Sequence, residues 1–190
     1  MASILVVCTG NICRSPIAEG FLRRDLERRF GPEAPDVSSA GVGAWDGAEV
    51  SEGSVVAAGE RGTDIADHRA RQVAPGLVRE ADLVLCMASD HRSAIDEMFP
   101  DASGRTFTLK ELVRLLESSP PNGAAPSLGA RVAAAGEARR RGFAGNPRDE
   151  DVADPLGQPL EAYRGVAWEL DELVRRLDVG LFGPRTEREG

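Results

Sequence analysis

The chain has 190 residues, of which 42% are hydrophobic and 28% charged, and its formal net charge is −8 at pH 7. This composition predicts one globular domain with a sizeable core, and the negative charge disfavours a general binder of nucleic acid or of membrane surfaces. The sequence holds 3 cysteines without disulfide-like spacing and no leader pattern or membrane-spanning apolar stretch, which together predict a cytoplasmic, reducing setting.

The segment directly after the first apolar run, Ile4–Val7, combines a cysteine, an arginine and a hydroxyl residue within eight positions. It reads Cys8-Thr9-Gly10-Asn11-Ile12-Cys13-Arg14-Ser15, and Pro16 then opens a helical pattern. A strand, a tight loop and a helix N-terminus in this order predict a cradle of backbone N–H groups for an anion. The same field favours a thiolate at Cys8, and the planar fork of Arg14 matches two phosphate oxygens. The loop therefore predicts a nucleophile and an oxyanion clamp in one segment, although Cys13 also fits a small buried residue.

Apolar patterns of strand type and of helix type alternate along the chain. Such alternation predicts a parallel sheet with right-handed crossovers, and Thr108 is placed to cap the helix that follows it. Strands are predicted at Ser3–Val7, Val37–Ser39, Leu83–Met87 and Arg105–Phe107, and helices near 15–30, 50–61, 89–99, 109–117 and 159–178.

These segments resemble the low-molecular-weight protein tyrosine phosphatases over residues 3–117 and 151–178. The resemblance implies an α/β three-layer sandwich with a four-stranded parallel sheet in the order 2-1-3-4, helices on both faces, and the cradle at the carboxyl ends of the strands. The similar stretches besides the loop are Val37–Gly41, the His-x-Ala-Arg-Gln segment within Asp67–Val73, the strand Asp82–Met87, and the pair Asp154-Pro155.

The resemblance also implies the roles of individual residues. Cys8 attacks phosphorus to give a phosphocysteine, Arg14 holds the equatorial oxygens, and Asp154 is the general acid, although Asp-Pro alone is equally typical of a turn. No metal or other cofactor is required. The other residues implied to bind substrate are Thr9, Gly10, Asn11, Ile12, Cys13, Ser15 and Trp45.

Asn11, Ser39 and His68 match positions of a network that keeps the cradle in shape. Ser39 also fits a plain strand end and His68 a surface histidine. Trp45 lies in a variable loop, where its ring either stacks on an aromatic substrate or joins the core. His91 matches no family position and is expected to face solvent.

Residues 118–150 look like an insertion into a single phosphatase domain that spans residues 1–178. Their Ser, Pro and Gly content indicates a linker, and residues 128–141 predict one short helix. The insertion is either a solvated excursion or a flap whose triple arginine, 139–141, meets acidic substrate residues. Residues 179–190 are predicted to form a disordered tail.

The substrate signals are mixed. Ile12 accompanies phosphotyrosine in similar proteins, whereas Leu156-Gly157 after the Asp-Pro pair and the segment 107–111 look more like the phosphoarginine group. We predict a phosphorylated protein as substrate with phosphotyrosine preferred, phosphate as product and inhibitor, and a monomer or weak dimer. The alternatives are a protein arginine phosphatase and a thiol-dependent arsenate reductase, which needs further cysteines. A non-enzymatic phosphoprotein-binding module would have lost Cys8, Arg14 or Asp154.

Overall fold

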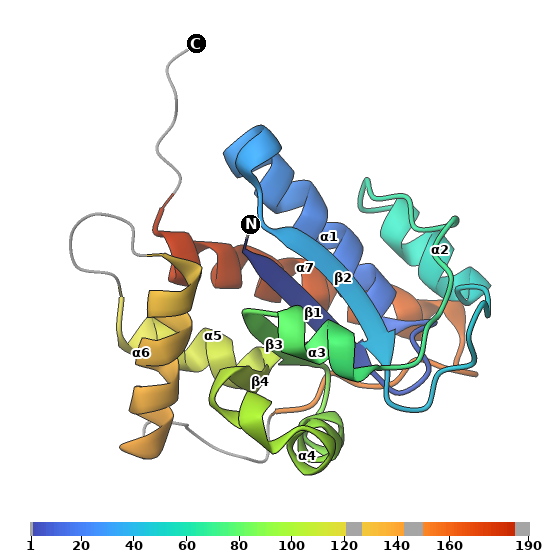
Figure 1. The fold of residues 1–190 in the computed structure, drawn as a ribbon. Coiled ribbons are helices and arrows are strands. Elements are labelled where there is room, and N and C mark those ends of the chain that lie inside the picture. Colours follow the sequence, from blue (N-terminus) through green and yellow to red (C-terminus); the bar gives the residue numbers. More distant parts are fainter. Residues whose placement is uncertain (1, 121–126, 143–149, 185–190) are drawn as a thin grey trace.

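A parallel sheet forms the middle layer of the computed structural model, which describes residues 2–120, 127–142 and 150–184 (Figure 1). Its strand order is β2-β1-β3-β4, and every pairing between neighbours is parallel, which confirms the predicted sheet. The strands β1 and β3 are almost wholly buried because helices cover both faces of the sheet. The strands are β1 (Ser3–Cys8), β2 (Asp36–Gly41), β3 (Leu83–Cys86) and β4 (Thr106–Thr108).

Helices form the two outer layers of the sandwich (Figure 1). One layer holds α1 (Arg14–Phe30), α2 (Glu52–Gly59), α5 (Leu109–Ser118), α6 (Leu128–Arg140) and α7 (Leu160–Phe182). The other holds α3 (Pro75–Glu80) and α4 (Ser89–Met98). Two short 3-10 turns, η1 (Gly31–Glu33) and η2 (Pro100–Arg105), complete the described elements, so the predicted three-layer sandwich is confirmed.

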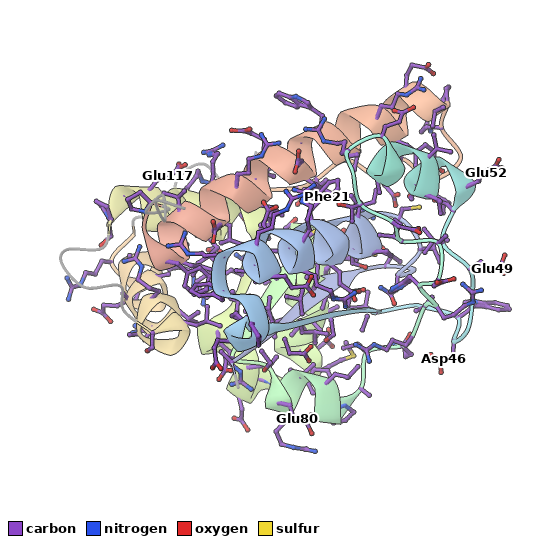
Figure 2. The ribbon with its side chains drawn as sticks, turned by 90° about the horizontal axis from the view of Figure 1, so that it is seen from above. Phe21, Asp46, Glu49, Glu52, Glu80 and Glu117 are labelled. Atoms are coloured by element: carbon purple, nitrogen blue, oxygen red, sulfur yellow. The ribbon has the colours of Figure 1, made fainter. Side chains whose placement is uncertain are left out.

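The alternation of β1 divides the core into two parts. Ile4 and Val6 face the larger cluster under α1 and α7, while Leu5 and Val7 face the smaller one under α3 and α4. Phe21 is fully buried between α1 and α7 (Figure 2). Burying such a ring stabilises the fold by roughly 1.5–3 kcal/mol, and it fixes the helix whose first turn carries the cradle.

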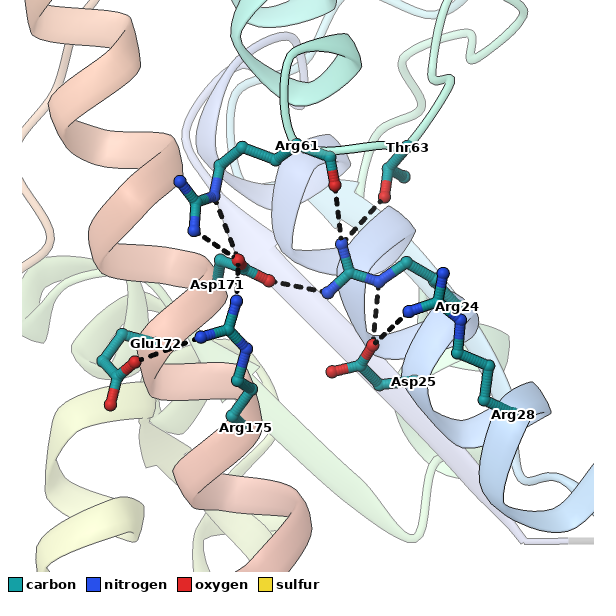
Figure 3. A network of polar contacts seen from close by, with 8 residues as sticks. All are labelled: Arg24, Asp25, Arg28, Arg61, Thr63, Asp171, Glu172 and Arg175. Atoms are coloured by element: carbon teal, nitrogen blue, oxygen red, sulfur yellow. Dashed lines mark hydrogen bonds and ion pairs between the residues drawn. The ribbon is translucent and has the colours of Figure 1, made fainter.

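An ion-pair network joins α1 and α7 to the turn after α2 (Figure 3). The buried carboxylate of Asp171 accepts from Arg24 Nη2 at 2.6 Å, Arg61 Nη2 at 2.5 Å and Arg175 Nη2 at 2.5 Å. Burial opposes the ionisation of Asp171, but the hydrogen bonds from Arg24 and Arg61 outweigh it and hold its pKa below the usual range. The network therefore keeps a charged group inside the helical layer by surrounding it with guanidinium groups.

The C-terminal helix is longer than predicted. It continues to Phe182, and residues 179–182 thus belong to the packed domain instead of a tail. Leu181 is 1% exposed, and the Phe182 ring packs edge-on against Phe30 with centroids 4.9 Å apart. The last residues of the predicted tail, 185–190, lie outside the described residues.

The predicted helix of the insertion exists as α6, but it is neither a solvated excursion nor a flap over the cradle. Its buried residues Leu128, Val132 and Ala135 join the larger core cluster. Arg139 donates to the carbonyls of Thr106 at 2.8 Å and Ser103 at 2.7 Å, next to β4. The flanking residues 121–126 and 143–149 lie outside the described ranges.

The neighbouring Arg140 and Arg141 both pair with Glu137 on the surface of α6. All three arginines of the triple therefore have partners inside the chain, which contradicts the idea of a free basic patch. None of the helices in the described ranges is long and apolar enough to cross a membrane.

Candidate active site

The cradle connects the end of β1 to the start of α1. Cys8 is the last residue of β1, is 3% exposed, and its Sγ accepts the backbone N–H of Asn11 at 3.3 Å. The Ser15 hydroxyl lies 2.9 Å from the same sulfur. Asn11 adopts a φ of 55°, the left-handed conformation that an asparagine tolerates and that bends the loop tightly. One backbone donor thus points at the sulfur on which a nucleophile would carry its negative charge, and the Ser15 hydroxyl is placed to donate to a thiolate there.

The carbonyl oxygens of the loop point outwards, into hydrogen bonds with the residues around it. Because the C=O and N–H groups of a trans peptide point in opposite directions, the amides that follow these carbonyls turn towards the centre of the loop. This orientation is what an anion cradle requires. The outward bonds run from Val42 N to the Cys8 carbonyl at 3.0 Å, from Gly43 N to that of Thr9 at 3.0 Å, and from Ser51 N to that of Ile12 at 2.9 Å.

Arg14 and Asp154 are in direct contact. The guanidinium, on a residue that is 6% exposed, donates from Nη2 to Asp154 Oδ2 at 2.7 Å and from Nη1 to the Val152 carbonyl at 3.0 Å. Its Nε is buried and has no hydrogen-bond partner among the described residues. The Asp154 side chain is 48% exposed and also accepts the backbone N–H of Leu156 at 3.2 Å. The predicted acid therefore lies beside the predicted oxyanion clamp.

A network behind the loop holds Asn11. Its side-chain amide nitrogen donates to Ser39 Oγ at 2.7 Å and to Ser15 Oγ at 2.9 Å, and His68 Nε2 lies 3.2 Å from its backbone carbonyl oxygen. Ser39 in turn donates to Glu19 Oε2 at 2.6 Å, and His68 Nδ1 lies 3.5 Å from the same oxygen. Burial lowers the pKa of His68, although the charge of Glu19 opposes the shift. The structure thus brings the predicted residues together and adds Glu19, which the sequence analysis missed.

Cys13 sits in the same loop but in a different environment. Its Sγ lies 3.2 Å from Ser51 Oγ, and Ser51 in turn donates to Ser54 Oγ at 2.8 Å. Burial raises the pKa of the Cys13 thiol, although the hydrogen bonds of Ser51 and Ser54 oppose the shift. The two cysteines of the loop therefore lie in different environments: Cys8 Sγ contacts the Asn11 N–H and the Ser15 hydroxyl, whereas burial raises the pKa of Cys13 beside Ser51.

The loop forms the floor of a cleft of about 350 Å³. Cys8, Arg14 and Asp154 line its polar part. The side chains around them are largely apolar, and two of them stand far into solvent: Trp45 is 84% exposed and Leu156 is 54% exposed. Trp45 thus lies beside the cradle as predicted and is not part of the core. Within the described residues, no cluster of His, Cys, Asp and Glu side chains is large enough to hold a metal ion.

Comparison with known proteins agrees with this geometry. The family model described as low molecular weight phosphotyrosine protein phosphatase matches residues 3–119. This chain belongs to that family. A protein-arginine-phosphatase from Geobacillus stearothermophilus is 36% identical over 174 residues, which cover 92% of each chain. The low-molecular-weight protein-tyrosine-phosphatase Wzb from Escherichia coli K12 is 41% identical over 105 residues, which cover 55% of this chain and 67% of Wzb.

A solved structure extends the comparison to the whole fold. The low-molecular-weight protein tyrosine phosphatase from T. tengcongensis superposes with a TM-score of 0.69 at 33% identity, covering 93% of this chain and 97% of that one. The family's model ends at residue 119, whereas this superposition covers most of the chain, so the likeness extends well beyond the family model.

In this low-molecular-weight phosphatase the prediction for His91 is wrong. The residue is 5% exposed, and its Nε2 lies 2.8 Å from Thr9 Oγ1 of the cradle. Burial, followed by the charge of Arg14, lowers the pKa of His91 to about 4, so the ring is neutral at pH 7. No local pattern could have found this contact, because it joins residues 82 positions apart.

Proposed function

We propose that this protein hydrolyses phosphotyrosine in proteins through a phosphocysteine intermediate. The observation that carries the proposal is the meeting of Cys8, Arg14 and Asp154 in one cleft with inward-facing loop amides. A sulfur nucleophile, an oxyanion clamp and a proton donor are the groups that the two displacements need.

In the first displacement the Cys8 thiolate attacks phosphorus, and the bond from phosphorus to the tyrosine oxygen breaks. Asp154 gives its proton to that oxygen, so that tyrosine leaves neutral. Arg14 and the loop amides hold the three equatorial oxygens, on which charge is concentrated in the transition state.

In the second displacement water attacks phosphorus and the sulfur–phosphorus bond breaks. The carboxylate of Asp154 now takes a proton from the water, which regenerates the acid and leaves inorganic phosphate and the thiolate. Phosphate therefore acts as product and as competitive inhibitor. We assign the enzyme to the cytoplasm, where thiols stay reduced, and expect a monomer or weak dimer.

The walls of the cleft favour an aromatic leaving group. Ile12, Trp45 and Leu156 present apolar surface around the polar floor, and a phenyl ring packs against such surface without losing hydrogen bonds. The N–H donors of a phosphoarginine would lose water there, and among the described residues that line the cleft only Asp154 offers a carboxylate.

A protein arginine phosphatase is the second candidate. It is favoured by the relative that matches 92% of this chain, which is named a protein-arginine-phosphatase, and by Leu156-Gly157 and residues 107–111, which look more like the phosphoarginine group. An arsenate reductase needs an accessible third thiol. Cys86 is fully buried in β3 and burial raises its pKa, which argues against that chemistry.

The deciding experiment compares kcat/KM for one peptide that carries phosphotyrosine and a matched peptide that carries phosphoarginine. We expect the wild type to prefer phosphotyrosine, and Ile12→Thr to narrow or invert the ratio by about 1–3 kcal/mol, the cost of one unpaired polar group. Cys8→Ser should abolish turnover of both peptides. A wild-type preference for phosphoarginine would overturn the assignment in favour of the second candidate.

A further inference from the structure

The first turn of α4 touches both loops of the cleft. On one side His91 Nε2 lies 2.8 Å from Thr9 Oγ1 in the cradle. On the other side the backbone N–H of Ser89 donates to Asp151 Oδ1 at 2.7 Å, three residues before Asp154. Arg92 lies 3.5 Å from Glu150 Oε2 in the same approach to the acid. One helix turn therefore contacts both the cradle, residues 8–15, and the segment that leads to Asp154, residues 150–154, which we call the acid loop.

Residues 150–152, which lead to Asp154, make further contacts with the rest of the fold. Glu150 is 6% exposed, and the backbone N–H of Val152 donates to the Met87 carbonyl at 2.8 Å, directly before α4. Val152 also accepts from Arg14, so the backbone that leads to the acid is tied both to the end of β3 and to the cradle. The backbone before Asp154 is thus held by contacts to the residues between β3 and α4 and by a contact to Arg14 in the cradle.

His91 is polar without a packing reason to be so. The residue is 5% exposed, and its Nδ1 is buried without a hydrogen-bond partner in the described part of the chain. A leucine would fill similar space without a buried unpaired nitrogen, which costs stability. The polar contact of the ring with Thr9 is what an apolar residue could not supply.

The ring is neutral at pH 7, because burial and Arg14 disfavour its protonated form more than the nearby acidic groups favour it. Those acidic groups are Asp90 on its own helix and Asp151 and Asp154 on the acid loop. A neutral ring keeps the same hydrogen bond across the range in which the enzyme would work. The contact with Thr9 therefore does not depend on protonation of His91 near pH 7.

We propose that His91 is a positioning residue that fixes the mouth of the phosphate-binding loop through its contact with Thr9. Because the same turn of α4 also binds Asp151, this contact sets the distance between the phosphate-binding loop and the acid loop. The proposal rests on the proposed function, since it assigns His91 a role in phosphate binding. Thr9 is exposed at the mouth of the loop, and the N–H that follows its carbonyl faces inward. Without the Thr9 side-chain contact, the first peptide of the cradle is held by its backbone hydrogen bonds alone. Misplacement by about 1 Å at a reacting group costs on the order of 10²-fold in rate.

The test measures the dissociation constant of inorganic phosphate by calorimetry, without any substrate. His91→Leu and Thr9→Val each remove the hydrogen bond, and each should weaken phosphate binding about five-fold, the effect of one neutral hydrogen bond. The double variant should be no weaker than either single one, because both remove the same contact. His91→Gln places an amide nitrogen near the position of Nε2 and should restore most of the affinity.

A second arm separates the cradle from the acid loop. Asp151→Ala cuts the bond to the Ser89 N–H, and it should lower kcat for phosphotyrosine more than for an activated aryl phosphate while leaving the phosphate dissociation constant within two-fold. Asp151→Asn keeps an oxygen at that position and should retain kcat. Glu117→Gln is the matched control, since it removes a carboxylate paired with Arg176 between α5 and α7, and it should change neither quantity.

Wild-type phosphate affinity in both His91→Leu and Thr9→Val would overturn the proposal, even if His91→Leu lowers the melting temperature, since it would reduce the ring to a packing element. Because phosphate binding is measured without turnover, this failure is visible whichever phosphorylated residue the enzyme cleaves. A wild-type protein that binds phosphate but cleaves no phosphorylated peptide would overturn the proposed function alone.

Discussion

Gly41, the last residue of β2, is where a single added methyl group should disturb the cradle most directly. A Cβ at this position would lie 2.3 Å from the Thr9 carbonyl oxygen and 2.8 Å from Ala44 Cβ. Real Cβ contacts essentially never fall under 3.0 Å, so the Thr9 backbone would have to move by at least 0.7 Å. That carbonyl already accepts the Gly43 N–H at 3.0 Å, so the movement breaks an existing bond or drags the loop with it.

Gly41→Ala should therefore weaken both stability and catalysis. Overpacking of this kind costs about 1–3 kcal/mol of unfolding free energy, and a displacement of the order of 1 Å beside the nucleophile lowers kcat/KM roughly 10²-fold. Urea unfolding measures the first quantity, and steady-state kinetics with an aryl phosphate measures the second. Gly59→Ala is the matched control, because its Cβ would meet nothing within 4 Å and the helix α2 accepts alanine.

A Gly41→Ala protein with wild-type stability and wild-type kcat/KM would refute the reasoning. It would mean that the Thr9 peptide can move without a loss of unfolding free energy. The hydrogen bonds to Val42 and Gly43 would then not fix the cradle.

The other predictions concern the acid, the second cysteine and the buried histidine. Asp154→Ala should lower kcat roughly 10²–10⁴-fold for a tyrosine leaving group and less for an activated aryl phosphate, and equal losses would make Asp154 a turn residue only. Cys13→Ser should make peroxide inactivation irreversible, because a Cys8 sulfenic acid then lacks the neighbouring thiol with which it forms a disulfide and water; full recovery of the variant with dithiothreitol would contradict this. His91 has its pKa lowered to about 4 in the fold, so its contribution to stability is complete above pH 6.5 and is lost as the pH falls towards 4. The unfolding free energy should drop there by roughly 1 kcal/mol per pH unit, and His91→Gln should flatten this slope in urea titrations at each pH; an unchanged slope would count against a neutral buried ring.

The sheet could be predicted from the sequence because β1 and β3 are short, continuous apolar runs, and the alternation with helical patterns indicated the more polar strands β2 and β4. The end of α7 could not. Gly180 looks like a helix stop, yet it lies inside the helix, where a Cβ would come within 2.8 Å of Leu116 Cβ. The glycine permits close packing of α7 on α5, and the helix ends instead at Gly183, which has a φ of 81°.

Shorter elements fall below the length at which a period is visible. The helix α3 has six residues and starts at Pro75, so it offers fewer than two turns of pattern. For the insertion, the helix was predicted correctly and its burial was not. A helix was predicted for it, but its burial depends on Leu128 and Val132 meeting the core, which no local pattern reveals.

In the candidate site, too, local patterns could be predicted and contacts between distant residues could not. The cradle residues are contiguous, so their spacing alone indicated an anion site. Glu19 and His91 act on the loop from other elements: Glu19 accepts from Ser39, which lies 20 positions away, and His91 reaches Thr9 across 82 positions. Long-range contacts of this kind depend on how helices are placed over the sheet, and they become visible only in the folded chain.

Asp154 and a bound phosphate would compete for the same Nη2 of Arg14, which donates to the carboxylate at 2.7 Å. The chain thus carries an internal competitor at its own anion site. A singly charged ion offers the guanidinium no more than the aspartate already does, whereas a phosphate monoester dianion brings twice the charge and three terminal oxygens in place of two. We therefore expect the pair to discriminate against monoanions. A dianion that displaces the carboxylate from Arg14 would also free Asp154 to face the departing oxygen.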